Sequence, residues 1–464
     1  MTGRQGATSA NSQANWLKLN NAKHQWHPVQ DPKAVAASPP LIIETGDGVY
    51  VTDIDGRRYL DCQGGLWCVN AGHGRQEIKD AITAQLDRLQ YYTLFPGTTH
   101  APSITLSAKL CEVTAEEDMA KVFFSSGGSD ANETALKIAR QYWRLVGEPD
   151  RTKIFSFKNG YHGLHFGATS AAGIGAYKAS FGPLLADFHQ AEFPYLYRNP
   201  FTQDPEELSA LCAALLERDI DYHSPGTIAA IIAEPVIGSG GVIVPPRSFW
   251  PRIRALCDTY GILLIADEVI TGLGRAGSIL GSRGYGVKPD ILCMAKALTN
   301  GYVPLGATLV NRRVASAWER EGVPAQFMHG YTYTGHPLAC AAGVASLDLA
   351  IKEDLAGNAA EVGDYFLDKL IVLQDKHPAI GEARGIGLMH ALELVKDRGT
   401  KEPFAPDDPL PKALTRFCVE HGVLIRCVGH KLILSPPLTF TRAHVDEAIE
   451  VIDRAFEQLP ATRM

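Results

Sequence analysis

Two apolar stretches near the middle of the chain each run into a single charged residue. Residues 262–266 (ILLIA) precede Asp267, and residues 291–295 (ILCMA) precede Lys296. Each stretch is too short for a core helix and is typical of a strand that is buried on both faces. In an open α/β sheet, ligands bind at the carboxyl ends of the strands. We therefore expect Asp267 and Lys296 to lie at such an end and to take part in chemistry there.

An acid and a buried amine suit one cofactor chemistry in particular. Burial favours the neutral form of a lysine, and a neutral amine is a nucleophile that forms a Schiff base with a carbonyl. Pyridoxal phosphate carries such a carbonyl, and an aspartate pairs with its ring nitrogen in enzymes that use it. The sequence predicts that Lys296 binds this cofactor covalently and that Asp267 keeps the pyridine nitrogen protonated.

A glycine-rich turn supplies a candidate phosphate site. The segment SSGGSDA (residues 125–131) lies between a predicted strand over residues 120–125 and a predicted helix over residues 132–145. Its backbone N–H groups can therefore face an anion at a helix N-terminus. The turn is not a P-loop, because no Gly-Lys-Ser/Thr follows it. We expect Gly128 and Ser129 to hold the phosphate.

A second glycine-rich segment, GLGRAG (residues 272–277), matches the pattern of dinucleotide-binding folds, and Asp290 follows it along the chain. Residues 278–289, however, contain further glycines and a proline instead of an amphipathic helix. We interpret the segment as a bend near the active site and not as a nicotinamide site.

Five motifs, in this order, resemble those of the class III aminotransferases, which are pyridoxal-phosphate enzymes of fold type I. They are FFSSGGSDANETALKIAR (123–140), YHG (161–163), AEPVIGSGGVIVPP (233–246), the DEV…AK pattern (267–296) and HGYTYTGHP (329–337). The resemblance extends from about residue 41 to about residue 459. Within the family, the chain looks most similar to the ω-transaminases that pair an amine or ω-amino acid with pyruvate.

The resemblance implies further residues at the cofactor. Tyr161, followed by His162, matches the tyrosine that stacks on the pyridine ring, and Val269 matches the residue that covers the opposite face. Glu234 matches an acid in a hydrogen-bond network beside Asp267. From the residues alone, a packed Tyr-His pair and an ordinary core valine remain alternatives.

Thr332 matches the threonine that reaches the phosphate of the neighbouring subunit. The resemblance therefore implies a homodimer with shared active sites, or a tetramer built from such dimers.

The resemblance also assigns the substrate pocket. Trp67, preceded by Leu66, matches the aromatic residue that lines the amine pocket, which Tyr161 also borders. Arg426 lies in an apolar run and matches the mobile arginine of ω-transaminases, whose guanidinium binds the carboxylate of pyruvate and moves aside for an amine without one. An arginine near a strand end is also typical of a surface salt bridge, so that alternative stays open.

The phosphate turn departs from the family pattern. Many relatives carry serine where this chain has Gly127 and glutamate where it has Asp130. Because Gly127 lacks the hydroxyl of that serine, the turn offers one possible hydrogen bond fewer to the phosphate, so we expect somewhat weaker retention of the cofactor.

The predicted function is transfer of an amino group from a primary amine or ω-amino acid to pyruvate by a ping-pong mechanism, with freed Lys296 moving the proton. A racemase or decarboxylase of the same fold uses the same Lys-Asp pair, and Arg426 favours a transaminase because a keto-acid acceptor needs a carboxylate clamp. A non-enzymatic nucleotide-binding or regulatory α/β protein has no use for a buried Lys296. The physiological donor stays open.

Composition limits the other possibilities. The 464 residues, 45% hydrophobic and 20% charged, are typical of a globular enzyme with more than one core. A net charge of −7 provides no basic surface for nucleic acid or an anionic membrane. The N-terminus lacks the apolar core of a signal peptide, and no apolar run approaches the length of a membrane span. Nine scattered cysteines without CxxC spacing favour a reducing, cytoplasmic location and no metal site.

The predicted fold is α/β. Strand and helix patterns alternate after residue 101, which predicts a mostly parallel sheet covered by helices on both faces. By resemblance this is the seven-stranded sheet of fold type I, in a large domain over residues 76–337. We expect a disordered tail over residues 1–15 and an extended arm over residues 16–40. Residues 16–75 and 338–464 should form a smaller α+β domain, with a helix over 338–352 and a single strand over 384–394.

Overall fold

The large domain is built on a seven-stranded sheet of order β4-β10-β9-β8-β7-β5-β6. In that order the strands are Met119–Ser125, Gly306–Asn311, Ile291–Met294, Leu263–Asp267, Ile228–Ala233, Lys153–Phe157 and Phe188–Ala191. Strand β10 runs antiparallel to both of its neighbours, and all other pairs are parallel. The predicted mostly parallel, seven-stranded sheet is therefore confirmed. The structure, a computed structural model, describes residues 4–322, 325–405 and 408–459.

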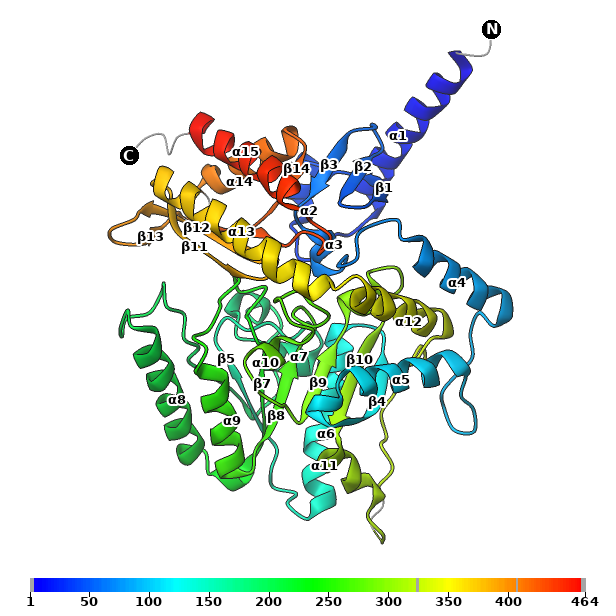
Figure 1. Cartoon of the computed structure of the whole chain (residues 1–464), viewed down its shortest axis with the longest axis vertical. Helices are drawn as coiled ribbons and strands as arrows, with labels where there is room; N and C mark the ends of the chain where they lie inside the picture. Colours follow the sequence, from blue (N-terminus) through cyan, green and yellow to red (C-terminus); the bar gives the residue numbers. More distant parts are fainter. Residues whose placement is uncertain (1–3, 323–324, 406–407, 460–464) are drawn as a thin grey trace.

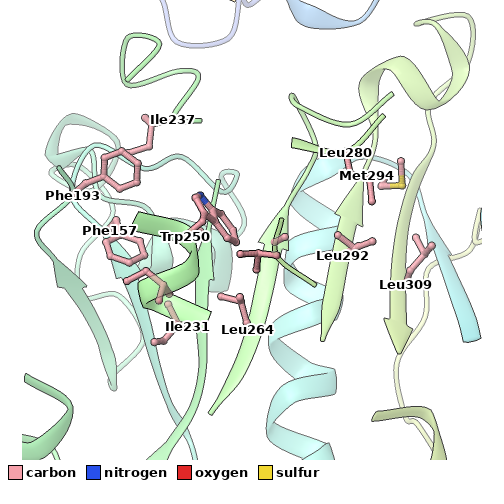
Figure 2. Packing of buried hydrophobic residues seen from close by; sticks show 14 of the residues in the cluster. Phe157, Phe193, Ile231, Ile237, Trp250, Leu264, Leu280, Leu292, Met294 and Leu309 are labelled. Carbon is pink, nitrogen blue, oxygen red and sulfur yellow. The ribbon is translucent and has the colours of Figure 1, made fainter. Parts of the chain in front are cut away.

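Helices cover both faces of this sheet, which explains why its central strands are apolar along their whole length. Strands β7, β8 and β9 are buried throughout. On one face, Ile231, Leu264, Leu292 and Leu309 come from four adjacent strands and belong to one buried cluster with Trp250 (Figure 2). Full burial of such a side chain contributes about 1.5–3 kcal/mol relative to leaving it exposed. The sheet is therefore a rigid base for residues at its carboxyl edge.

The helices divide between the two faces of the sheet. The first face is covered by α5 (Ala101–Val113), α8 (Pro205–Tyr222), α9 (Phe249–Tyr260) and α12 (Pro337–Lys352), and the second by α6 (Gly128–Val146), α7 (Phe166–Ala171) and α11 (Arg312–Ala315). Helix α4 (Gln76–Arg88) packs against α12, and the helices α3 (Gly64–Trp67) and α10 (Gly281–Gly284) have four residues each. Three residues of α12 lie in the core of the large domain, whereas Ala350 lies in that of the small domain. The boundary predicted after residue 337 therefore falls too early by most of α12.

The small domain joins the two ends of the chain (Figure 1). One sheet contains β1 (Ile43–Asp47), β2 (Tyr50–Asp53), β3 (Arg58–Asp61) and β14 (Val423–Leu424), and β3 pairs with β14 in parallel. The other contains β11 (Ile380–Ile386), β12 (Met389–Asp397), β16 (Lys431–Leu434) and β15 (Arg426–Val428), with β13 (Glu402–Pro403) beside β12. Helices α13 (Leu355–Lys376), α14 (Pro409–Glu420) and α15 (Arg442–Gln458) share its core with N-terminal residues such as Leu60.

Three local predictions are wrong. Residues expected to form a tail and an extended arm instead form helix α1 (Arg4–His24), which projects from the body, and α2 (Pro32–Ala37) (Figure 1). Residues 1–3 lie outside the described residues. The single strand predicted over 384–394 is the hairpin of β11 and β12, because Gly387 adopts φ +54° and a Cβ there would lie 2.4 Å from the Arg275 carbonyl oxygen.

The second glycine-rich segment lies between the domains. Arg275 is fully buried and donates to the carbonyls of Leu388 and Pro436 and, at 2.7 Å, to the Asn70 side chain. Only the four-residue helix α10 follows the segment. Asp290 forms ion pairs with Arg254 and Arg313. It directly precedes β9 and therefore lies at the opposite end of that strand from Lys296. The segment is therefore a bend between the domains, and its predicted place near the active site stays a prediction. Within the described residues, no helix is both long and apolar enough to cross a membrane.

Candidate active site

The carboxyl ends of three central strands meet the N-terminus of α6 around one cavity of about 370 Å³. Asp267 ends β8, Lys296 follows β9 after one residue, and Glu234 follows β7 directly. The eight residues predicted to bind the cofactor within one chain all line this cavity, namely Gly128, Ser129, Tyr161, His162, Glu234, Asp267, Val269 and Lys296. Burial on both faces of the sheet thus brings together residues that are far apart in sequence.

Lys296 presents an amine to the cavity from a strained position. It begins a short 3₁₀ helix (Lys296–Thr299) with φ +46°, a left-handed conformation that costs a non-glycine residue about 1–3 kcal/mol. Burial lowers the pKa of Lys296, although Cys68, Asp267 and Glu234 oppose this shift. The environment therefore increases the fraction of neutral, nucleophilic amine.

Asp267 is held by three donors. Its Oδ2 accepts from Asn132 Nδ2 at 2.7 Å and lies 2.8 Å from His162 Nδ1, and its Oδ1 accepts from the Val269 N–H at 3.1 Å. Because an ionised carboxylate only accepts, the imidazole of His162 donates through Nδ1. The Asn132 amide also donates to the His162 carbonyl at 2.8 Å. These bonds fix the orientation of the carboxylate towards the cavity.

Asn132 is a residue that the sequence reasoning missed. It lies one helical turn after Gly128 on α6, so the i,i+4 spacing from the phosphate turn was the signal that could have identified it. Its side chain is buried, and its Oδ1 has no hydrogen-bond partner among the described residues.

Glu234 connects two loops beneath the cavity. Its Oε1 accepts from the Tyr161 N–H at 2.8 Å and its Oε2 from the Gly238 N–H at 2.9 Å. Burial raises the pKa of Glu234 to about 7, with Asp267 adding to the shift and His162 opposing it. A change in its protonation therefore falls near neutral pH.

The phosphate turn is shaped by close packing. A Cβ at Gly128 would lie 2.7 Å from Val269 Cγ1, so the backbone can approach the valine only with glycine there. Asp130 accepts from the Ser126 N–H at 2.9 Å and fixes the turn. Because the first N–H groups of a helix have no intrahelical partner, the start of α6 can bind an anion. The hydroxyl oxygen of Ser129 accepts from the Leu164 N–H at 3.3 Å, which leaves its own hydrogen available.

The predicted amine-pocket residues lie next to the cofactor cavity in the sequence and in the packing. Trp67 is 1% exposed and packs in a cluster with Ile270, which itself lines the cavity. Leu66 is 51% exposed, and Cys68, which follows Trp67, lines the cavity. Leu66 and Trp67 both adopt left-handed φ values near +67°. That these two residues line the amine pocket stays a prediction.

Arg426 lies on edge strand β15, close enough to the cavity for its charge to lower the pKa of Lys296. Its guanidinium carbon is 5.8 Å from the centre of the Trp67 ring. Burial lowers the pKa of Arg426 itself. Its Nη2 is buried and has no hydrogen-bond partner among the described residues, so the open alternative of a surface salt bridge is not what the structure contains.

Thr332 does not line the cavity of its own chain. It is exposed, and its carbonyl accepts from the Tyr91 hydroxyl at 2.6 Å.

The donor set fits a flat aldehyde with an anionic tail. An amine and a carboxylate share the cavity, Tyr161 and Val269 contribute an aromatic and an apolar wall, and the start of α6 offers N–H groups. Pyridoxal phosphate requires these features. The fold and the site together define a pyridoxal-phosphate enzyme of fold type I.

Comparisons with known proteins narrow this class. The family model for aminotransferase class-III matches residues 33–456. Putrescine–pyruvate aminotransferase from Pseudomonas aeruginosa is 38% identical and covers 96% of both chains, and diaminobutyrate–2-oxoglutarate transaminase from Halomonas elongata is 39% identical over 91% of both. An amine transaminase from an uncultivated Pseudomonas species, solved in its PLP-bound form, is 52% identical with a TM-score of 0.92, covering 94% of this chain and 99% of that chain.

The chain belongs to the class III aminotransferases, and its cofactor is pyridoxal phosphate. The non-enzymatic alternative is thereby excluded. Because the relatives are named as transaminases, amino-group transfer is also favoured over a racemase or decarboxylase reaction.

Restoring a hydroxyl at the phosphate turn should strengthen cofactor binding. Gly127 has an extended φ of 177°, and a Cβ there would meet nothing within 4 Å. We expect Gly127→Ser to lower the dissociation constant of pyridoxal phosphate roughly 2- to 10-fold, the effect of one added hydrogen bond. Equilibrium dialysis of the cofactor measures it, with Gly127→Ala as the matched control. Equal constants for the two variants would contradict the weaker retention inferred from this departure.

The raised pKa of Glu234 should make the cofactor-free protein less stable as the pH rises. Its folded-state pKa is about 7 against an ordinary value of 4.5. The folded chain therefore keeps a proton that the unfolded chain loses, so this contribution is complete below pH 4.5 and is lost as the pH rises through 7.

We expect Glu234→Gln to remove about 3.5 kcal/mol of that decline in unfolding free energy, because the two pKa values differ by 2.5 and each unit corresponds to about 1.4 kcal/mol. Denaturant titrations between pH 4.5 and 8 measure the slope. A variant with the slope of the wild type would show that another group titrates.

Proposed function

We propose that this aminotransferase moves an amino group from a primary amine or ω-amino acid to pyruvate, giving alanine, by a ping-pong mechanism. The observation that carries the proposal is the buried Nη2 of Arg426, which lies beside the cavity of Lys296 and has no hydrogen-bond partner within residues 4–322, 325–405 and 408–459. A guanidinium without a partner is suited to a carboxylate, which every keto-acid acceptor has. The similarity to a putrescine–pyruvate aminotransferase supports an amine donor and a pyruvate acceptor.

The residues of the chain have distinct tasks in this reaction. Pyridoxal phosphate, when bound, supplies a carbonyl that takes up the amino group and a ring that accepts electron density. Lys296, more readily neutral because burial lowers its pKa, would take a proton from the carbon that bears the amino group and give it to the former aldehyde carbon, and it would move a proton in the reverse direction in the second half-reaction. Asp267, fixed by Asn132 and His162, would face the ring nitrogen. Tyr161 and Val269 would confine the ring between them.

Arg426 would separate the two kinds of substrate. A donor without a carboxylate does not need the guanidinium, whereas the acceptor does. Its Nη2 has no hydrogen-bond partner in the part of the chain that the structure describes, so both N–H groups of this nitrogen are available to an acceptor carboxylate. A relative named for 2-oxoglutarate makes that dicarboxylate the other acceptor to test.

The proposal is tested by assaying a panel of amine donors with pyruvate or 2-oxoglutarate and scoring the amino acid formed. Borohydride should remove the yellow colour of the wild type and label Lys296, and Lys296→Ala should be inactive. Arg426→Ala should raise the KM for pyruvate about 10- to 100-fold, the cost of a charge-assisted pair, and leave carboxylate-free donors unaffected. Pyruvate that is no better an acceptor than 2-oxoglutarate, or intersecting double-reciprocal lines, would contradict the proposal.

We also propose a homodimer with shared active sites, the same dimer being the unit of any tetramer. Thr332 is exposed and remote from the cavity of its own chain, as expected if it reaches the phosphate of a partner. Nearby apolar side chains are also exposed, among them Phe95, Met328 and Tyr333. Sedimentation should give a dimer or tetramer, and Thr332→Ala should weaken cofactor binding. A monomer that retains the cofactor would refute this.

A cytoplasmic location is also proposed, on the basis of cysteine chemistry. All nine cysteines are free, and six of them are buried. Free thiols in this number suit a reducing compartment.

A further inference from the structure

We propose that Glu393 is a positioning residue for carboxylate recognition. Through the polar contacts around it, Glu393 fastens the β15–β16 hairpin to the large domain and so holds Arg426 beside the cavity. The inference rests on the carboxylate-binding role proposed above for Arg426.

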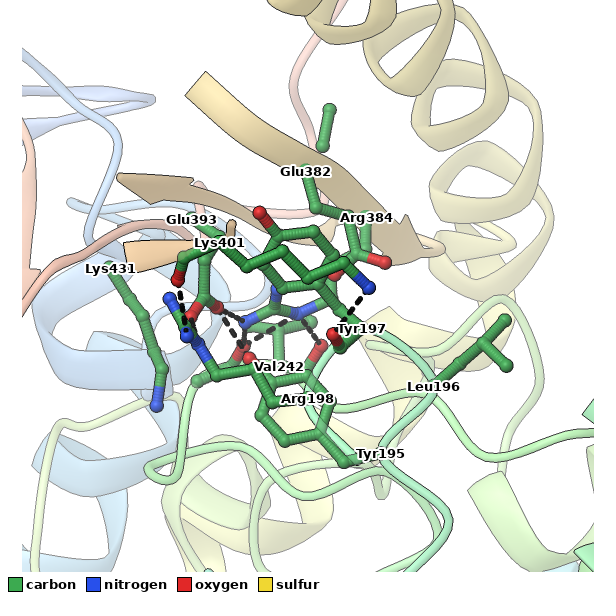
Figure 3. Close-up of polar contacts among 12 residues, drawn as sticks. Tyr195, Leu196, Tyr197, Arg198, Val242, Glu382, Arg384, Glu393, Lys401 and Lys431 are labelled. Atoms are coloured by element: carbon green, nitrogen blue, oxygen red, sulfur yellow. Dashed lines mark hydrogen bonds and ion pairs between the residues drawn. The ribbon is translucent and has the colours of Figure 1, made fainter. Parts of the chain in front are cut away.

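Glu393 lies on β12, is fully buried, and is surrounded by donors (Figure 3). Its carboxylate lies 2.8 Å from Arg384 Nη2 and 3.0 Å from His430 Nε2, and it also accepts from the Tyr195 hydroxyl and from Arg198 Nε. Burial acts to raise the pKa of Glu393, but these donors hold the pKa well below its ordinary value. The carboxylate is therefore ionised and contacts four polar side chains.

These contacts cross the boundary between the domains. Tyr195 and Arg198 follow β6 in the large domain, whereas Glu393, Arg384 and His430 belong to the small domain. We refer to Tyr195, Arg198, Arg384, Glu393, His430 and Lys431 as the Glu393 clasp. Removing one partner of such a buried charge leaves the others uncompensated, so the clasp acts as a unit.

The clasp also holds a loop of the large domain. Arg384 donates to the Gly241 carbonyl from Nε at 3.0 Å and from Nη2 at 2.6 Å, and Lys431 Nζ donates to the Gly240 carbonyl at 2.9 Å. The same loop begins at Glu234, which accepts from the Gly238 N–H. The small domain is thereby attached to the loop that follows Glu234, at residues outside those that line the cavity.

The register of the sheet connects the clasp with Arg426. Glu393 pairs with Lys431 across β12 and β16, and two residues further along Ala391 pairs with Ile433. Ile433 pairs in turn with Arg426 across β16 and β15. Because side chains alternate between the faces of a strand, Arg426 lies on the face that carries the clasp, about 7 Å along the strands. That face packs on the large domain, where Ala391 and Ile433 share a cluster with Trp67.

Strand β16 is held by its pairing with β12, whereas β15 has three residues and is the last strand in its sheet. The turn between β15 and β16 passes through Gly429 at φ +61°. The clasp contacts this hairpin at its tip, through His430 and Lys431. A loosened tip would therefore allow Arg426 to leave the position in which it meets a carboxylate.

A purely structural role predicts something different from a positioning role. A clasp that only joined the domains would, when broken, impair every substrate alike. A positioning role predicts weaker binding of carboxylates with unchanged reaction of an amine that has none.

The experiment compares Glu393→Gln and Lys431→Met with the control Lys396→Met. Lys396 lies on the same strand but makes only an exposed ion pair, with Glu402 at 3.3 Å. Calorimetry on the cofactor-loaded enzyme gives the dissociation constant of propionate, an unreactive carboxylate. Stopped-flow absorbance gives the single-turnover rate of the first half-reaction with 1-phenylethylamine. We expect propionate to bind roughly 5- to 10-fold more weakly to both clasp variants, with the amine rate within about twofold of wild type and the control unchanged on both measures.

Equal losses on both measures, or no loss on either, would overturn the proposal. If Glu393→Gln fails to fold, Lys431→Met, which removes the bond to the Gly240 carbonyl, decides the outcome in the same way. If the wild type binds no propionate and uses no keto acid, the role proposed for Arg426 has failed. Hydrogen exchange then tests separately whether the Glu393 clasp fastens the β15–β16 hairpin. Faster exchange over residues 426–434 in a clasp variant than in Lys396→Met supports that role, and equal exchange refutes it.

Discussion

The site depends on enclosing a lysine amine and a carboxylate within one protein cavity without pairing them to each other. Lys296 and Asp267 end adjacent strands, and each is held by its own surroundings: a strained backbone for the lysine, and donors from Asn132, His162 and Val269 for the acid. Had the two formed a tight ion pair, the amine would be charged and unreactive. The sheet makes the separation possible, because strands covered on both faces cannot shift in register without exposing their apolar side chains.

The residues that could be predicted from sequence are those whose local pattern is complete within a few positions. The strands before Asp267 and Lys296 are uninterrupted apolar runs because parallel strands are buried on both faces, and the phosphate turn lies between a strand and a helix. The seven-stranded sheet and the joining of the chain ends in one domain followed from the family resemblance and are confirmed by the structure.

The residues that could not be predicted depend on distant partners. Glu393 stands in an apolar strand, and its donors Tyr195 and Arg198 come from a loop nearly two hundred residues earlier. The family resemblance assigns Trp67 to the amine pocket, but it does not indicate the left-handed turn at Leu66 and Trp67 that carries the ring. No local pattern encodes that turn, since neither Leu66 nor Trp67 favours positive φ. Helix α1 was mistaken for an arm because its sequence has little amphipathic character.

The parallel pairing of β3 with β14 has a consequence for the order in which the protein is made. Leu60 lies beside Val423, so the N-terminal strands leave the ribosome long before the strand that completes their sheet. At about 5–20 residues per second, that delay is on the order of 20 to 70 seconds. During this delay the large domain can form without the small domain, whereas the apolar edge at Leu60 and Cys62 is exposed because β14 has not yet been made. The newborn chain thus passes through an interval in which a chaperone has a defined surface to protect.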